Sequence, residues 1–183
     1  AILSREQEKI WETIRDLGVD MSVFDVLSYP NLFHNLKAAI KDACTSESGK
    51  HLNIYYEDTS ISPDEMLEIV RSKDFSRLPK IMSEAAKEAY EALLHTRDGQ
   101  LCDIIIDKAQ LEAVYQAGKE AALRYLDIFG KDNYFLELQD HGIPEQQNVN
   151  QQLLKMHRET GIDLVATNDV HYTLAEDAQP HDV

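Results

Sequence analysis

Apolar residues recur at helical spacing through the first two thirds of the chain, and this pattern changes near residue 120. A repeat of three and four residues predicts amphipathic helices. We expect such helices from a cap at Ser4 to Leu17, and over residues 31–44, 80–95 and 101–117. A run of short helices of this kind predicts an all-α segment.

Local start and stop signals mark the predicted helix ends. Gly18 can end the first helix in the left-handed conformation, and Gly99 is placed to close the helix over residues 80–95. Pro30 interrupts the second helical region, so we expect that helix to begin near Asn31. Ser62, followed by proline and two acidic residues, predicts another helix start.

The pattern after residue 120 predicts a different structure. A helix over residues 121–129 is followed by short apolar runs at 133–139 and 162–167, which predict strands. Between them, residues 144–160 predict a helix that ends at Gly161. Strand, helix and strand with short connections form a βαβ unit with a parallel pair. The fold class is therefore mainly α, with a small βαβ fragment at the end.

Composition excludes several function classes. The formal net charge of −15 argues against a surface that binds nucleic acid through phosphates, and against direct adhesion to anionic lipid. No window of about 18 apolar residues is present, so we expect no membrane insertion. The chain starts without Met and stops just after a helix-like start, which leads us to expect a fragment.

Candidate chemistry in the helical part is sparse. Cys44 and Cys102 match no metal spacing, and we expect small, buried, reduced thiols. His34 lies on a predicted helix, where a structural contact is favoured over catalysis. Asp103 and Asp107 share a helix face, which indicates a solvated face or a basic partner rather than a metal site.

The first part of the chain resembles the C-type subunit of the V/A-type rotary ATPases, which carries the letter d in the eukaryotic complex. The resemblance lies in residues 22–27, 33–41, 74–79, 84–89, 98–100, 102–109 and 112–115. It implies an all-α protein with no catalytic residues and no cofactor. It also implies that this protein passes torque between the membrane rotor ring and the central stalk, which would be its partners. The location implied is cytoplasmic, peripheral to the membrane through those partners.

The last part resembles the PHP domain of the alpha subunit of bacterial DNA polymerase III. This resemblance lies in residues 122–133, 136–143, 165–172 and 176–178. In that family a strand-end Asp-x-His supplies two ligands to a metal cluster, and Asp169 and His171 occupy those positions. Residues two apart on a strand point to the same face, so both could reach one zinc or manganese ion. The family's other ligands have no counterpart in residues 1–120.

Three functions remain open at this stage. The domains predicted are 1–120, a partial segment of the V/A-type ATPase C type, and 121–183, a PHP fragment. Coverage favours a coupling protein without activity of its own. The alternatives are a polymerase fragment with phosphoesterase-like chemistry, or a foldable composite in which neither function survives. A natural, artefactual or engineered join near residue 120 fits the sequence equally.

Overall fold

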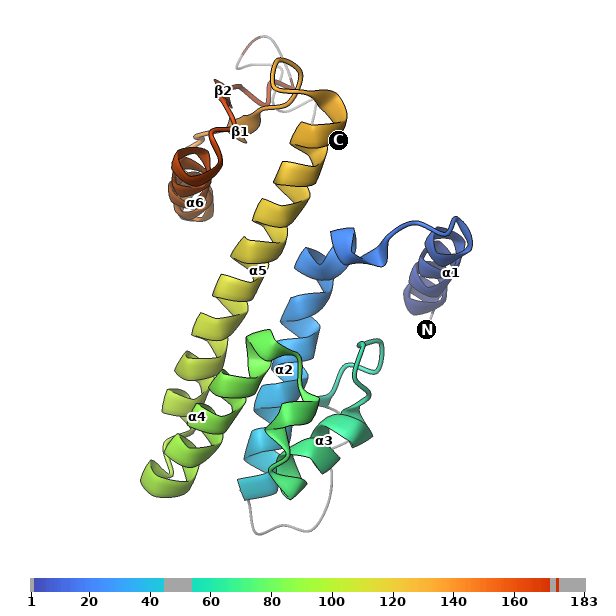
Figure 1. Ribbon diagram of the computed structural model, residues 1–183, viewed down its shortest axis with the longest axis vertical. Coiled ribbons are helices and arrows are strands. Elements are labelled where there is room, and N and C mark those ends of the chain that lie inside the picture. The colour runs from blue at the N-terminus through green and yellow to red at the C-terminus, as the bar shows by residue number, and fades with distance from the viewer. Residues whose placement is uncertain (1, 45–53, 172–173, 175–183) are drawn as a thin grey trace. The chain divides into compact units, whose positions relative to one another are not determined.

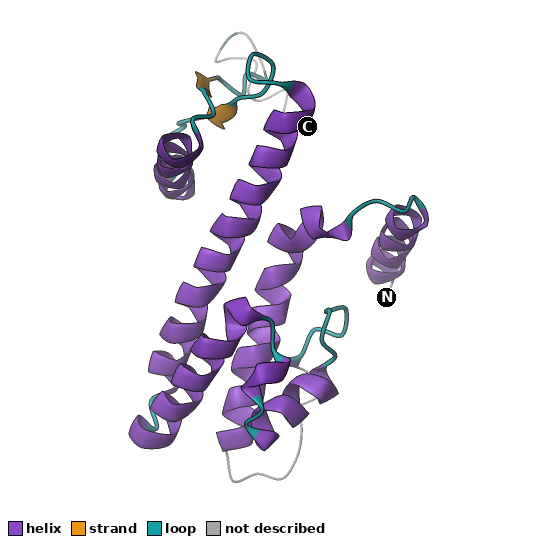
Figure 2. Cartoon of the chain, viewed as in Figure 1, coloured by secondary structure: helices purple, strands orange, loops and turns teal. Residues whose placement is uncertain are grey.

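Helices make up nearly all of the regular structure in residues 2–44, 54–171 and 174, which the computed structural model describes (Figures 1 and 2). The chain divides into two units, Ala1–Gly118 and Lys119–Val183. The mainly α prediction is confirmed, because the two strands of the described residues are only three residues long each. The assignment of the two predicted domains to two families is a separate matter, and stays a prediction.

The described residues of unit 1 are mainly helical and include short 3₁₀ turns. In chain order, the helices and turns are α1 (Ile2–Asp16), η1 (Met21–Phe24), α2 (Asp25–Cys44), α3 (Pro63–Ser72), η3 (Phe75–Arg77), α4 (Lys80–Thr96) and the first part of α5 (Gly99–Phe129).

The core of unit 1 forms around α2. Phe33, Leu36 and Ile40 of this helix are fully buried, and α3 and α4 both pack against it. Helix α5 adds Cys102 and Ile106 to the same cluster. Residues three and four apart lie on one face of a helix, so the spacing of the α2 residues produces a continuous buried stripe.

Two predicted helix starts in unit 1, those of α3 and α2, can be compared with the structure. Ser62 caps α3, because its hydroxyl accepts a hydrogen bond from the Glu65 amide at 3.3 Å, as the sequence predicts. The prediction that α2 begins near Asn31 is wrong, since the helix starts at Asp25 and includes Pro30. Proline removes one backbone donor, and the Ser28 hydroxyl, 3.2 Å from the Asp25 carbonyl oxygen, adds a hydrogen bond in the preceding turn.

The connection between α4 and α5 also differs from the prediction. Arg97, not Gly99, takes the left-handed conformation that ends α4, with φ of 56°. Asp98 then caps the next helix by accepting hydrogen bonds from the Gln100 and Leu101 amides. The predicted break between residues 117 and 121 is absent, because α5 continues through Gly118. A single glycine costs a helix only about 1 kcal/mol relative to alanine, and good helix formers surround it.

Unit 2 contains a βαβ unit, as predicted. Strands β1 (Leu136–Leu138) and β2 (Leu164–Ala166) pair in parallel, with Leu136 opposite Leu164, and α6 (Pro144–Thr160) connects them. The prediction for α6 is confirmed, including its end at Gly161, which adopts the left-handed conformation. Both strands are shorter than predicted. Four buried apolar residues form the core of the described part of this unit: Ala122, Leu136, Met156 and Ile162.

The α2-centred core makes a stability prediction. We expect Phe33→Ala to lower the free energy of unfolding by about 3–5 kcal/mol, because it removes a fully buried aromatic ring and leaves a cavity. Leu27→Ala is the matched control, since Leu27 lies on the same helix but is 65% exposed, and its change should stay within about 0.5 kcal/mol. Urea unfolding followed by circular dichroism measures both. Equal effects of the two substitutions would contradict this account of the core.

Candidate functional sites

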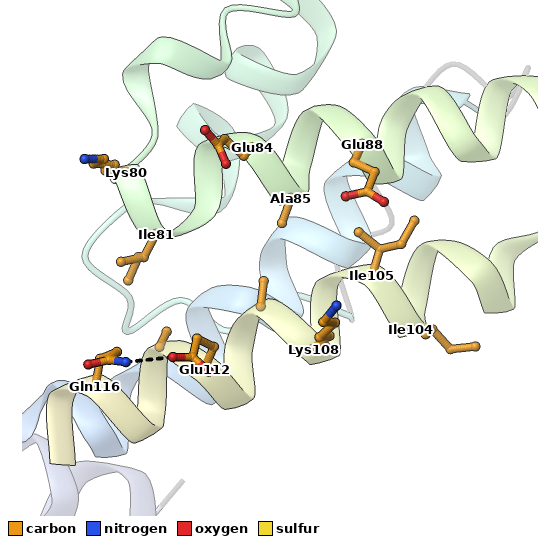
Figure 3. Close-up of a pocket in the computed structure, with 12 residues that line it drawn as sticks. Lys80, Ile81, Glu84, Ala85, Glu88, Ile104, Ile105, Lys108, Glu112 and Gln116 are labelled. Atoms are coloured by element: carbon orange, nitrogen blue, oxygen red, sulfur yellow. Dashed lines mark hydrogen bonds between the residues drawn. The ribbon is translucent and has the colours of Figure 1, made fainter. Parts of the chain in front are cut away.

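A groove runs between α4 and α5 in unit 1, and Figure 3 shows the side chains that line it. Its volume is about 650 Å³. The apolar lining residues are Ile81, Ala85, Ile104, Ile105, Ala109 and Ala113, and the polar ones are Lys80, Glu84, Glu88, Lys108, Glu112 and Gln116. A groove lined by both apolar and charged side chains can hold an amphipathic helix from a partner.

Two parallel ion pairs hold α5 against α2. The Lys37 ammonium lies 2.6 Å from Asp107 Oδ1, and the Lys41 ammonium lies 2.7 Å from Asp103 Oδ1 and 2.8 Å from Asp103 Oδ2. The two lysines are four residues apart on α2, and the two aspartates are four residues apart on α5. Both ion pairs therefore lie along the same side of the contact between these helices. The sequence left two interpretations of Asp103 and Asp107, a solvated face or a basic partner. The second is correct, and the partner is the pair of lysines on α2 of the same chain.

Polar side chains of α2 fix the segment that precedes α3. The buried Asn35 amide donates to the Tyr56 carbonyl oxygen at 2.7 Å and accepts from the Tyr56 amide at 2.9 Å. His34 Nε2 lies 2.8 Å from the Ile54 carbonyl oxygen. His34 thus makes the structural contact that the sequence favours. The Tyr55 hydroxyl donates to Asp42 at 2.8 Å, and burial, followed by this hydrogen bond, raises the pKa of Tyr55.

The two thiols are free in the structure. Cys102 is fully buried, as predicted, whereas Cys44 is half-buried. Burial, with the negative charge of Asp103 adding to it, raises the pKa of Cys102 to about 11. A thiol with so high a pKa carries little thiolate at neutral pH and is a poor nucleophile.

The two predicted metal ligands of unit 2 lie close together after β2. His171 Nδ1 is 3.5 Å from Asp169 Oδ1 and 3.1 Å from the Asp169 carbonyl oxygen. The second contact requires a hydrogen on Nδ1, because a carbonyl oxygen can only accept. Both residues lie beyond the last strand residue, Ala166, so the alternation of a strand is not what brings them together.

These residues do not make up the donor set of a metal cluster. Within residues 2–44, 54–171 and 174, no group of three or more His, Cys, Asp or Glu side chains is placed to hold a metal ion. Asp169 and His171 are both exposed. A two-metal centre needs more ligands than one carboxylate and one imidazole, so the pair alone does not support two-metal chemistry.

Several polar residues around the strands of unit 2 form hydrogen bonds with one another. Glu137 accepts a hydrogen bond from the Thr167 hydroxyl across the strand pair. The backbone amide of His141 donates to Gln146 Oε1 at 2.9 Å, which ties the loop after β1 to the start of α6. His141 is therefore a loop histidine with local partners.

The groove is the feature that the sequence does not reveal. Its apolar residues read as ordinary core positions of two amphipathic helices. One signal is present, because Ala85, Ala109 and Ala113 are small where helices approach. Periodicity cannot show whether small side chains allow close packing or leave an opening.

The described part of unit 1 is helical, which gives its structural class. Comparison with known families identifies the family. Residues 1–131 match the ATP synthase (C/AC39) subunit family, and the chain belongs to this family. It is therefore related to subunits that work with other subunits of a rotary ATPase. Among the described residues, no helix is both long and apolar enough to span a bilayer.

Partial similarity to a second protein is also found. DNA polymerase III subunit alpha of Saccharopolyspora erythraea is 48% identical over 67 residues, which is 37% of this chain and 6% of that protein. The Thermus aquaticus protein is 53% identical over 58 residues, 32% of this chain and 5% of its own length. The Treponema pallidum protein is 36% identical over 108 residues, 57% of this chain and 9% of its own length.

The chain thus spans less than a tenth of these polymerases. Only 52 residues follow residue 131, so each of the three matches is long enough to overlap the family match. The resemblance to two families is confirmed. No solved structure matches the chain significantly.

The ion pairs between α2 and α5 predict a measurable coupling. A double-mutant cycle of Lys37→Met and Asp107→Asn should give a coupling free energy of about 0.5–1 kcal/mol, which falls in 1 M salt, because Asp107 is partly exposed. A second cycle that pairs Lys37 with Glu91, an exposed carboxylate on α4, is the control. The two changes in unfolding free energy should add within about 0.5 kcal/mol in this cycle. Urea unfolding provides the four free energies. Coupling of the same size in the control would show that the pair is not specific.

Proposed function

We propose that the chain is a non-catalytic coupling component of a V/A-type rotary ATPase, placed between the central stalk and the membrane rotor ring and serving ion transport. The observation that carries this proposal is the match of residues 1–131 to the C/AC39 subunit family. In this role the protein is cytoplasmic and peripheral to the membrane, and its partners are the stalk and ring subunits.

The physical properties of unit 1 support such a role. A part that passes torque has to resist bending and has to present docking surfaces. The buried stripe of α2 provides stiffness, because close-packed interiors have low compressibility. The Lys37–Asp107 and Lys41–Asp103 pairs add a second row of contacts between α2 and α5.

Binding to the rotary complex tests this proposal. We expect the chain to be retained by immobilised central-stalk and rotor-ring subunits of a V/A-type ATPase. Phe33→Ala should reduce the retained amount at least about tenfold at a temperature where it is unfolded, because binding depends on the helical core. Leu27→Ala is the matched control and should be retained like the unchanged chain. Failure of the unchanged, folded chain to bind either partner would refute the proposal.

Metal binding is a second candidate function, favoured by the similarity to the polymerase alpha subunits and by the proximity of Asp169 and His171. If this pair forms a site, it is one for a single zinc or manganese ion with water completing the ligand set. Phosphoesterase or DNA-synthesis activity does not follow from two ligands.

Calorimetric titration with zinc chloride and manganese chloride tests the pair. We expect weak binding whose heat is lost in His171→Ala, because the substitution removes the only nitrogen ligand of the pair. His141→Ala is the control, since His141 is another exposed histidine of unit 2, and its heat should match the unchanged chain. Equal heats from all three proteins, or none from the unchanged chain, would exclude this site.

A further inference from the structure

A smaller pocket lies in unit 2, between the end of β1 and the first part of α6. Its volume is about 260 Å³, just below the roughly 300–1,000 Å³ of pockets that hold drug-sized molecules. Two carboxylates line it, Glu137 of β1 and Glu145 of α6, and no lysine or arginine is among the described residues that do so. Asp169 and His171 do not line the pocket, so it differs from the pair considered for metal binding.

Two side-chain amides of the lining are oriented by hydrogen bonds within the protein. Asn150 donates through Nδ2 to the Gln139 carbonyl oxygen at 2.8 Å, which leaves its Oδ1 as an acceptor for a ligand. The Thr167 hydroxyl donates to Glu137, so the same hydroxyl accepts from Gln139 Nε2 at 3.3 Å. The Oε1 atom of Gln139 is then also an acceptor. In both amides, a nitrogen donor is engaged by the protein and the oxygen is left to a ligand.

Negative charge adds to these acceptors. The Glu145 side chain is exposed, and no hydrogen bond or ion pair within the described part of the chain involves its carboxylate. Glu137 accepts one hydrogen bond, whereas a carboxylate has room for about four. The start of α6 contributes roughly half a positive charge, which the two carboxylates outweigh. A ligand of this pocket therefore has to donate hydrogen bonds and carry positive charge.

The remaining lining favours an organic cation over a metal ion. Val149 and Leu153 lie four residues apart on α6, which places them on one face of the helix, and they give the pocket an apolar side. Methylene groups are stabilised against such a surface, whereas a hydrated metal ion is not. Among the described residues, no group of three or more His, Cys, Asp or Glu side chains is placed to hold a metal ion.

We propose that this pocket binds a primary ammonium group carried on a short methylene chain. The two glutamates supply the opposite charge, the oxygens of Gln139 and Asn150 accept hydrogen bonds from the ammonium group, and the apolar side of the pocket contacts the methylene groups. An ammonium group has three donors and no acceptor, which matches an acceptor-rich lining. The same chemistry occurs in free diamines and at the end of a lysine side chain of a partner protein.

Titration of the full chain with putrescine, a four-carbon diamine, tests the proposal by two-dimensional NMR. We expect the side-chain amide signals of Gln139 and Asn150 to shift in a saturable way. The affinity should fall when sodium chloride is added, because salt screens exposed charges. The four-carbon diol is the matched control ligand, because it keeps the methylene chain and lacks the charge. The diol should shift neither signal.

Substitutions locate the binding. Glu145→Gln should raise the dissociation constant of putrescine about threefold, because it removes one charge of an exposed pair. Asp132→Asn is the matched control, since Asp132 is an exposed carboxylate of unit 2 that does not line the pocket, and it should leave the dissociation constant unchanged. Val149→Ala should weaken the binding of putrescine but not of methylammonium, which has no methylene chain to cover.

A single lysine with an acetylated amino end and an amidated carboxyl end separates the two sources of the ligand. Saturable binding of this lysine at least as tight as that of putrescine would assign the pocket to a side chain of a partner. Binding of putrescine alone would assign it to a free amine. The proposal is overturned if neither compound gives a saturable shift or if the diol binds as well. Equal weakening by Asp132→Asn would also overturn it, because it would indicate general attraction to the net charge of −15. Binding to rotary ATPase subunits is a separate readout, so either proposal can fail without the other.

Discussion

Burial of one face of α2 is the constraint on which unit 1 depends. Phe33, Leu36 and Ile40 lie on that face, and Met66 of α3 and Ile106 of α5 belong to the same buried cluster. Because elements from distant parts of the sequence share one stripe, none of them can shift without exposing apolar surface, at a cost of about 25 cal/mol for each Å². The polar residues of α2 also hold neighbouring segments in place. Asn35, for example, fixes the Tyr56 backbone from a buried position where an unpaired amide would cost more than about 1 kcal/mol.

The same arrangement explains why a groove is left between α4 and α5. One side of α5 carries Asp103 and Asp107, which are drawn to lysines of α2, and the adjacent side carries the buried Ile106. These contacts orient α5 toward α2. The side that remains for α4 includes Ala109 and Ala113, whose methyl groups are too short to fill an interhelical space. The groove is therefore a consequence of how α5 is held, and it does not require a dedicated sequence motif.

Helix ends that depend on hydrogen bonds within one turn of the chain could be predicted from the sequence. Features that depend on packing against other helices could not. The start of α3 at Pro63 and the end of α6 before Gly161 follow from local hydrogen bonding and from the freedom of glycine at positive φ. The sequence predicts breaks at Pro30 and between residues 117 and 121, where Gly118 lies, yet the helices continue through both. Each costs a limited amount that a long packed helix can absorb. Among candidate sites, the Asp169–His171 pair could be named because both residues are near neighbours in the chain, while the groove depends on side-chain size across two helices.

The two units place different physical limits on the functions considered for them. Unit 1 has a buried cluster drawn from several helices, so the groove between α4 and α5 keeps its shape as long as that cluster stays packed. The described part of unit 2 has four buried apolar residues and a parallel pair of three-residue strands. An isolated pair of strands is marginal in water, and parallel pairs are usually covered on both faces. Asp169 and His171 follow such a strand closely, so their separation is only as fixed as the pairing of β1 with β2. The proximity of these two side chains should therefore be lost under milder conditions than the shape of the groove in unit 1.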